Sequence, residues 1–147
     1  MTIHISGPPA GLRGSKLDSR LLRSRAGRIL RELGEAKSEL SIALVSDPDI
    51  AELNASWRNR EGPTDVLSFS MLEGEHADRR GELLGDVVIG VEAAARQAAA
   101  RHRSMDEELA RLLIHGVLHL LGYDHQKREQ ERIMKKMQSV LWKACTS

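Results

Sequence analysis

Three of the chain's six histidines lie in one stretch, LIHGVLHLLGYDH, at residues 113–125. His115 and His119 are four residues apart, so on a helix they lie one turn apart on the same face, where both imidazoles can reach one metal ion. On a straight helix His125 would point about 240° around the axis from His119. The helix must therefore end before His125 can become a third ligand, and Gly122 stands where a left-handed turn residue is needed.

Three imidazoles at this spacing predict a catalytic metal site. Zinc accepts neutral histidine nitrogens at about 2.0–2.1 Å, and three protein ligands leave a fourth position for water, as in catalytic rather than structural zinc sites. The reaction class indicated is hydrolysis. Any one histidine among leucines is more often a hydrogen-bonded core residue, so the prediction rests on all three together. Imidazoles also accept nickel, copper or iron, which leaves the identity of the metal open.

Gly116 departs from the pattern of zinc peptidases, which carry a glutamate general base directly after the first histidine of such a pair. In this chain that position has no side chain. A glycine inside a helix costs about 1 kcal/mol relative to alanine, so we expect Gly116 to serve close packing of the helix against a neighbour. The residues therefore indicate a metal hydrolase without the peptidase base.

Together these residues resemble the signature of the YbeY family, the bacterial rRNA-maturation endoribonucleases with a single zinc. The resemblance rests on HGVLHLLGYDH at 115–125, on LNASWR at 53–58 with PTDVLSF at 63–69, and on LGDVVI at 84–89. These segments follow the expected order and, with the length, cover most of the chain apart from the first dozen or so residues and the last few. The resemblance implies a zinc-dependent endoribonuclease that prefers single-stranded RNA and acts in ribosomal RNA maturation and ribosome quality control.

The same resemblance implies the site residues and the partners. His115, His119 and His125 would hold one zinc ion per chain, and Arg58 would correspond to a functional arginine of the family. A guanidinium can grip a phosphate through two parallel hydrogen bonds, which suits the negative charge of a phosphodiester transition state. The implied partners are ribosomal RNA and ribosome or small-subunit assembly proteins, with no DNA and no membrane.

The residues leave several roles open. Asp124 could accept a proton from a ligand histidine or hydrogen-bond the backbone of the turn. Asp65 and Asp86 could transfer protons, although Asp65 also suits a strand start and Asp86 a satisfied polar group on a sheet. Neither the general base nor the attacking group is decided. Two other functions remain: a metallopeptidase-like hydrolase, and a non-catalytic ribosome assembly factor stabilised by zinc.

Length and composition predict one domain, residues 1–147, long enough to bury about two thirds of its unfolded surface. No apolar run approaches the roughly 20 residues of a membrane helix, and the N-terminus lacks a secretory signal pattern. The single cysteine, Cys145, cannot form an internal disulfide, so a cytoplasmic location is expected.

The net charge of the chain is only +1, so a positively charged surface that binds RNA would have to be local. The possible stacking platforms are Trp57, Phe69, Tyr123 and Trp142, too few for a broad single-strand binding surface.

The apolar patterns predict an α+β fold, a zincin-like domain in which about five helices pack on a small mixed four-stranded sheet. The predicted strands are 2–6, 39–46, 64–70 and 82–90, and the predicted helices are 17–33, 48–58, 91–103, 105–121 and 126–144. The first two strands could pair in parallel across a helix, whereas the last two have no helix between them and favour antiparallel pairing. The metal site would lie on the helix at 105–121, which is apolar nearly all round and is therefore expected at the centre.

Local signals refine these elements. Ser104 and Glu107 fit a capping box, and Asp47 is expected to cap a helix whose first residue is Pro48. The buried stripe of the first helix is predicted as Leu17, Leu21, Ile29, Leu30 and Leu33, with Arg20, Arg23, Arg28 and Arg31 on a solvated face that could alternatively touch ribosomal RNA. The last helix is predicted to turn inward Ile133, Met134, Met137, Val140 and Leu141. An exposed loop is expected at 71–81, with His76 in it.

Overall fold

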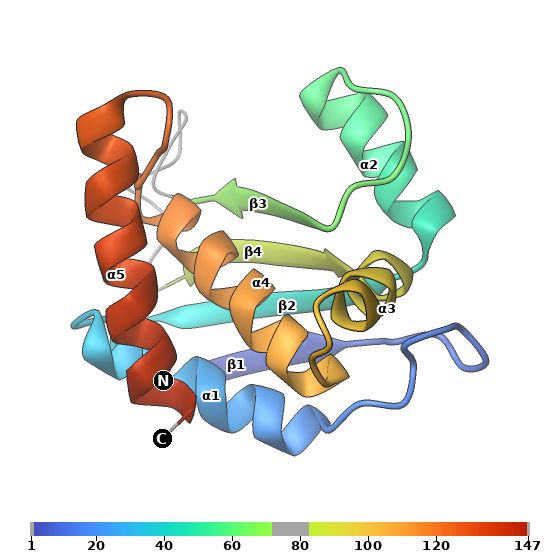
Figure 1. Ribbon diagram of the computed structural model, residues 1–147, viewed down its shortest axis with the longest axis horizontal. Coiled ribbons are helices and arrows are strands. Elements are labelled where there is room, and N and C mark those ends of the chain that lie inside the picture. Colours follow the sequence, from blue (N-terminus) through green and yellow to red (C-terminus); the bar gives the residue numbers. More distant parts are fainter. Residues whose placement is uncertain (1, 72–82, 147) are drawn as a thin grey trace.

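The predicted four strands and five helices are confirmed in the part of the chain that the computed structural model describes, residues 2–71 and 83–146 (Figure 1). The strands are β1 (Thr2–Ser6), β2 (Glu39–Val45), β3 (Val66–Ser70) and β4 (Leu83–Gly90). The helices are α1 (Ser19–Glu32), α2 (Asp47–Arg58), α3 (Val91–Ala100), α4 (Met105–Leu120) and α5 (Arg128–Thr146). The prediction for His76 lies outside the described residues.

The sheet is mixed, with strand order β1-β2-β4-β3. β1 pairs with β2 and β2 with β4 in parallel, whereas β3 runs antiparallel to β4. The β1–β2 and β3–β4 pairings match the predictions, and the β2–β4 pairing was not predicted. This order makes β3 an edge strand. Within the described residues, its backbone is paired on one side, by β4.

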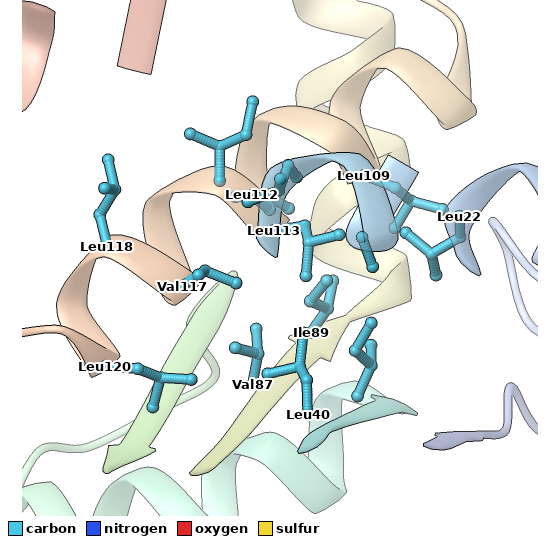
Figure 2. Close-up of a cluster of buried hydrophobic side chains, with 14 of the residues drawn as sticks. Leu22, Leu40, Val87, Ile89, Leu109, Leu112, Leu113, Val117, Leu118 and Leu120 are labelled. Carbon is cyan, nitrogen blue, oxygen red and sulfur yellow. The ribbon is translucent and has the colours of Figure 1, made fainter. Parts of the chain in front are cut away.

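The two faces of the sheet pack against different helices (Figure 1). On one face, strand residues such as Val87 and Ile89 join the large core formed with α1, α4 and α5. Figure 2 shows Leu113 and Val117 of α4 above these two side chains. On the other face Val88 belongs to a small cluster with Ile50 of α2. Side chains alternate along a strand, so neighbouring residues of β4 serve different layers.

α4 is the central helix, as predicted from its apolar surface. It begins at the predicted capping box: the Ser104 hydroxyl accepts from the Glu107 N–H at 3.1 Å, and the Glu107 carboxylate accepts from the Ser104 N–H at 3.0 Å. Leu112 and Leu113 lie on neighbouring faces and are both buried. Fully burying a leucine contributes about 1.5–3 kcal/mol, so this helix is firmly held. A firmly held helix is a suitable base for metal ligands.

Gly116 allows α4 to approach the sheet, as the sequence predicted. A Cβ atom built at this position would lie 2.7 Å from Cγ1 of Val87, closer than real carbon atoms approach. Because the glycine has no side chain, the backbone of α4 packs directly on the Val87 side chain of β4. This close packing fixes the height of the neighbouring histidines above the sheet.

Three local predictions were wrong. Ser46, not Asp47, caps α2: its backbone is extended and its hydroxyl accepts from the Asp49 N–H at 3.3 Å, while Asp47 is already helical. Pro48 is therefore the second helical residue. α3 ends at Ala100 rather than at residue 103, because His102 adopts a left-handed conformation (φ 55°) that a helix cannot continue through.

The buried stripes of the two outer helices also differ from the prediction. In α1 the predicted Ile29 and Leu30 are buried, but Leu22 is buried in place of Leu21, which is only partly covered. In α5, Ile133 and Val140 are 44% and 38% exposed, while the buried residues are Met134, Leu141 and Cys145. α5 packs mainly along α1 and α4, so a narrow stripe of its surface is covered rather than a broad face. Within the described residues, no helix has the length and apolar character to cross a membrane.

Candidate metal centre

α4 places the first two histidines as the spacing predicted. The Nε2 atoms of His115 and His119 lie 3.1 Å apart, and the ring centroids lie 4.5 Å apart. Both rings are partly buried on the same face of the helix. Two imidazole nitrogens thus point at one location.

A tight turn after α4 returns the chain toward these rings. Gly122 has φ +92° and its N–H donates to the His119 carbonyl at 3.0 Å, while the Tyr123 N–H donates to the Leu118 carbonyl at 3.0 Å. This pair of bonds is the Schellman arrangement that ends a helix on a left-handed glycine. It satisfies two carbonyls that the helix end would leave without partners.

His125 follows this turn as predicted, and its ring centroid lies 6.0 Å from that of His115 and 5.6 Å from that of His119. Asp124 Oδ1 accepts from the His125 backbone N–H at 2.7 Å. Of the two roles considered for Asp124, the structure therefore shows the hydrogen bond to the backbone of the turn. This bond orients the segment that carries the third histidine.

The three histidines fit a metal ion. One ligand atom from each lies within 4.8 Å of the others, and this is the one such group of three or more histidine, cysteine or acidic side chains within residues 2–71 and 83–146. Two nitrogens bound tetrahedrally to zinc at about 2.0–2.1 Å are about 3.4 Å apart, close to the 3.1 Å between His115 and His119. His125 is exposed, so its ring can rotate to complete the set.

Electrostatics keep the two helical imidazoles uncharged. Burial, followed by the neighbouring His119, lowers the pKa of His115 to about 4, although Asp65 acts in the opposite direction. Burial and then His125 lower the pKa of His119, opposed by Asp124 and by a hydrogen bond to the Tyr123 backbone. Neutral imidazole is the form that binds a metal, so both rings are ready to bind at neutral pH.

Gln138 of α5 contacts the far side of a candidate ligand. Its Nε2 atom lies 3.1 Å from Nδ1 of His115. A histidine that binds through Nε2 carries its proton on Nδ1, and a glutamine can turn its amide oxygen to accept that proton. Sequence reasoning missed this residue, because nothing local relates positions on separate helices.

The histidines open onto a pocket of about 740 Å³. The edge strand β3 forms one wall, and the segment before it carries two arginines to the rim. The lining residues are Arg58, Arg60, Thr64, Asp65, Val66, Leu67, Ser68, Phe69, Ser70, His115, His119 and Gln126. The pocket therefore brings together two of the predicted metal ligands and the predicted arginine, which are far apart in the sequence.

Arg58 is the last residue of α2. Its guanidinium carbon lies 5.1 Å above the centre of the Phe69 ring, and Nη2 donates to the Ser68 carbonyl. Both contacts are with β3, so the edge strand holds the arginine at the pocket. A cation over an aromatic face is attracted by the ring's electrons.

Two serines that sequence reasoning missed attach β3 to α4. Ser68 Oγ donates to the Gly116 carbonyl at 2.8 Å, and Ser70 Oγ donates to the Leu120 carbonyl at 2.9 Å. Two residues along a strand and four along a helix span nearly the same length, about 6–7 Å, so the two bonds form in register. They fix the pocket wall relative to the helix that carries the histidines.

Asp65 is held by hydrogen bonds at the start of β3. Oδ1 accepts from the Val66 N–H at 2.8 Å, and Oδ2 accepts from Gln97 of α3 at 3.0 Å. Gln97 in turn accepts from Arg111 at 2.8 Å, and Arg111 forms an ion pair with the fully buried Glu108. This chain of contacts ties α4 and α3 to the first residues of β3, which fits the strand-start role considered for Asp65.

Asp86 does not face the histidines. Its neighbour Val87 packs on the α4 side of the sheet, and successive strand residues point to opposite faces. Asp86 therefore belongs to the α2 side and does not line the pocket. Its position matches the polar sheet residue that the sequence allowed.

The arginines of α1 do not form one free basic face. Arg23 donates to the Ile3 carbonyl, and Arg28 donates to the Cys145 carbonyl at 3.4 Å. Arg20 and Arg31 are exposed. Two of the four arginines thus help attach α1 to its neighbours.

Comparison with known proteins identifies relatives over most of the chain. Residues 15–146 match the family model described as Endoribonuclease YbeY. The chain is 43% identical over 145 residues to Endoribonuclease YbeY of Anaeromyxobacter sp. strain Fw109-5, with 98% of this chain and 72% of the relative covered. It is 42% identical over 147 residues to Endoribonuclease YbeY of Salinispora tropica, with 91% and 94% covered.

A solved structure shares the fold. The solution structure of TM1509 from Thermotoga maritima is similar with a TM-score of 0.59 and 28% sequence identity, and the match covers 97% of this chain and 90% of that one. The agreement extends over the sheet and the helices together. The predicted α+β architecture is confirmed by this likeness and by the element order.

Proposed function

This chain belongs to the YbeY family of endoribonucleases, and from that premise we propose that it is a zinc-dependent enzyme that cleaves single-stranded regions of ribosomal RNA during maturation and quality control. The observation that carries the proposal is the convergence of His115, His119 and His125, two of which line a pocket with Arg58 at its rim. A metal centre beside an arginine is suited to a phosphodiester, whose hydrolysis develops negative charge.

In this proposal His115, His119 and His125 hold one zinc ion per chain through their neutral imidazole nitrogens. When bound, zinc would act as a Lewis acid that stabilises negative charge on a phosphoryl oxygen. Burial of His115 and His119 keeps both rings uncharged and available, and the turn at Gly122 brings His125 to them. Gln138 orients the His115 ring from behind.

Arg58 binds the scissile phosphate in this proposal. A guanidinium carries five N–H donors, so its contact with the Ser68 carbonyl leaves donors for phosphate oxygens. The contacts with β3 orient the group before substrate arrives, which favours an interaction that strengthens as charge develops. Lysine cannot reproduce this paired geometry.

The two other functions are not favoured. A peptidase would need a glutamate at position 116, yet any side chain there would collide with Val87. A zinc-stabilised assembly factor without catalysis would not need a pocket with an arginine beside the histidines. We therefore retain the ribosome and small-subunit assembly proteins as proposed partners of the enzyme, and a ribosomal RNA substrate would place it in the cytoplasm.

The test is cleavage of a labelled single-stranded RNA by zinc-loaded protein, compared with His119→Ala and Arg58→Lys purified identically. We expect both variants to lose activity, and only the histidine variant to lose zinc. Arg20→Ala on α1 is the matched control, because it removes an exposed arginine that does not line the pocket and should leave cleavage unchanged.

Equal cleavage by all preparations would indicate a contaminating nuclease and overturn the proposal. Zinc binding without RNA cleavage by the parent protein would instead support the assembly factor. Digestion of a casein substrate by the parent, abolished in His119→Ala, would support the peptidase.

A further inference from the structure

Trp57 is the most exposed of the large apolar side chains within the described residues, at 68%. It stands next to Arg58 in the last turn of α2, and its ring meets Phe69 edge to face, with centroids 6.3 Å apart and planes at 73°. Phe69 lines the pocket of the candidate metal centre. The indole therefore lies beside the pocket with most of its surface open to solvent, where an aromatic ring is costly to leave uncovered.

The surroundings of Trp57 are positively charged. Arg58 and Arg60 both line the pocket rim, and neither forms an ion pair with a carboxylate in the parts of the chain that the structure describes. An exposed ring next to such guanidinium groups matches the two parts of a nucleotide, an aromatic base and an anionic phosphate. The second tryptophan differs, since Trp142 is half-buried and already covered by Arg103 at 5.1 Å.

The size of the exposed surface favours one base over a protein partner. The other exposed large apolar residues in the described ranges, Ile133 and Val140, lie on α5. α5 packs against α1 and α4, whereas α2 packs against β4 and α3, so these residues do not extend the surface around Trp57. A protein interface needs a broad apolar patch, while a nucleobase needs one ring face.

We propose that Trp57 stacks on one base of the RNA substrate while Arg58 holds an adjoining phosphate at the metal centre. The proposal rests on the proposed function and deepens it, because it supplies a physical cause for a preference for single strands. A base inside a duplex is already stacked and paired on both sides, so it cannot cover the indole without being pulled out of the helix.

The first test measures cleavage kinetics with zinc-loaded protein and a short single-stranded RNA. Stacking on an aromatic residue is worth about 1–3 kcal/mol per base, so Trp57→Ala should raise KM by about 5- to 150-fold and leave kcat nearly unchanged. Trp57→Phe retains a ring and should recover most of the loss. Val140→Ala, which truncates another exposed apolar residue, should behave like the parent. Thermal unfolding checks that each variant is folded.

The second test identifies the base. Single abasic nucleotides are placed in turn along a 2′-O-methyl RNA, and binding to parent and Trp57→Ala is measured by fluorescence anisotropy. At one position the missing base should weaken binding to the parent by about the same factor as Trp57→Ala, and should have no further effect in that variant. If at every position the missing base weakens binding by the same factor in the parent and in Trp57→Ala, the two effects are independent and the stacking proposal is overturned.

The outcomes separate this inference from the proposed function. Cleavage by the parent with unchanged KM in Trp57→Ala, and no coupling to any base, would reject the role of Trp57 and leave the endoribonuclease proposal intact. Coupling to one base without cleavage by the parent would retain Trp57 as a base-stacking residue and reject the catalytic proposal.

Discussion

At the residue scale, Gly116 shows how one absent methyl group shapes the site. The position faces Val87 on β4, and Ser68 Oγ would lie 3.3 Å from an added Cβ atom. Alanine is the better helix former, so a purely local view would predict that Gly116→Ala stabilises α4. The packing decides otherwise, because the side chains of Val87 and Ser68 already occupy the space that an added methyl group would need.

We predict that Gly116→Ala lowers the free energy of unfolding by about 1–3 kcal/mol, as overpacking of a dense core does. Urea unfolding of the metal-free protein measures the effect. Because Val87 supplies the nearest atoms, Val87→Ala should relieve part of the clash, and the double variant should be more stable than the sum of the single effects requires. Strict additivity would contradict this account.

His115 gives a second prediction, for the pH dependence of stability in the metal-free protein. Its pKa falls from about 6.5 in an unfolded chain to about 4 in the folded protein. Between these values the unfolded chain binds the proton and the folded protein does not, so stability falls as pH drops from about 6.5 and levels off below about 4. The loss from this residue is at most about 3 kcal/mol, and smaller to the extent that water reaches the ring.

Replacing His115 with leucine should flatten the stability profile over that range. Urea midpoints of parent and His115→Leu at a series of pH values measure the difference, since carboxylates contribute equally to both proteins. If stability depends on pH in the same way in both proteins, His115 binds its proton equally in the folded and unfolded states.

At the scale of elements, the end of α4 determines whether His125 can reach the other two candidate ligands, His115 and His119. Gly122 has φ +92°, and an added Cβ would meet nothing within 4 Å. An alanine at position 122 would therefore clash with no neighbour, and its cost would be the strain of a left-handed backbone conformation. Gly34, after α1, has φ +75° and is equally open, but it is far along the chain from the histidines.

We predict that Gly122→Ala and Gly34→Ala each lower stability by about 1–2 kcal/mol, the cost of a left-handed alanine. Only Gly122→Ala should also weaken zinc binding, by roughly tenfold if about 1.4 kcal/mol of strain is relieved when His125 moves away. Competition with a chromophoric chelator measures the affinity. Equal zinc affinities in the two variants would show that the turn does not position His125.

At the scale of the whole molecule, the candidate metal centre joins the central helix to the segment that leads into the last helix, in addition to the packing of α5 on α4. His115 and His119 lie within α4, His125 lies in the segment before α5, and Gln138 contacts His115 from α5 itself. A bound ion would therefore hold the end of the central helix and the start of the last helix together. Metal binding to the folded state alone must raise stability.

We predict that zinc at about 1,000 times its dissociation constant adds about 4 kcal/mol to the free energy of unfolding of the parent protein. Chelation should reverse the gain, and His119→Ala should show none. Thermal unfolding with and without zinc provides the measurement. An equal shift in His119→Ala would place the stabilising zinc at another site.

Much of the fold could be predicted from the sequence because the relevant interactions are local. The capping box of Ser104 and Glu107, the turn at Gly122 and the pairing of His115 with His119 all act within about one helical turn. The alternation of apolar residues likewise defined the strands. Where neighbouring residues are both good helix caps, as Ser46 and Asp47 are, the local signal misled: Asp47 was predicted as the cap of α2, and the structure has Ser46.

The residues by themselves determined the candidate metal site: three imidazoles, their spacing, and the helix end that lets the third return. Only the tertiary structure decided what surrounds that chemistry. It brought Arg58 and Trp57 from α2 to β3, attached β3 to α4 through Ser68 and Ser70, and placed Gln138 behind His115. These contacts join residues on separate elements, and their geometry depends on strand order and helix packing rather than on any local pattern.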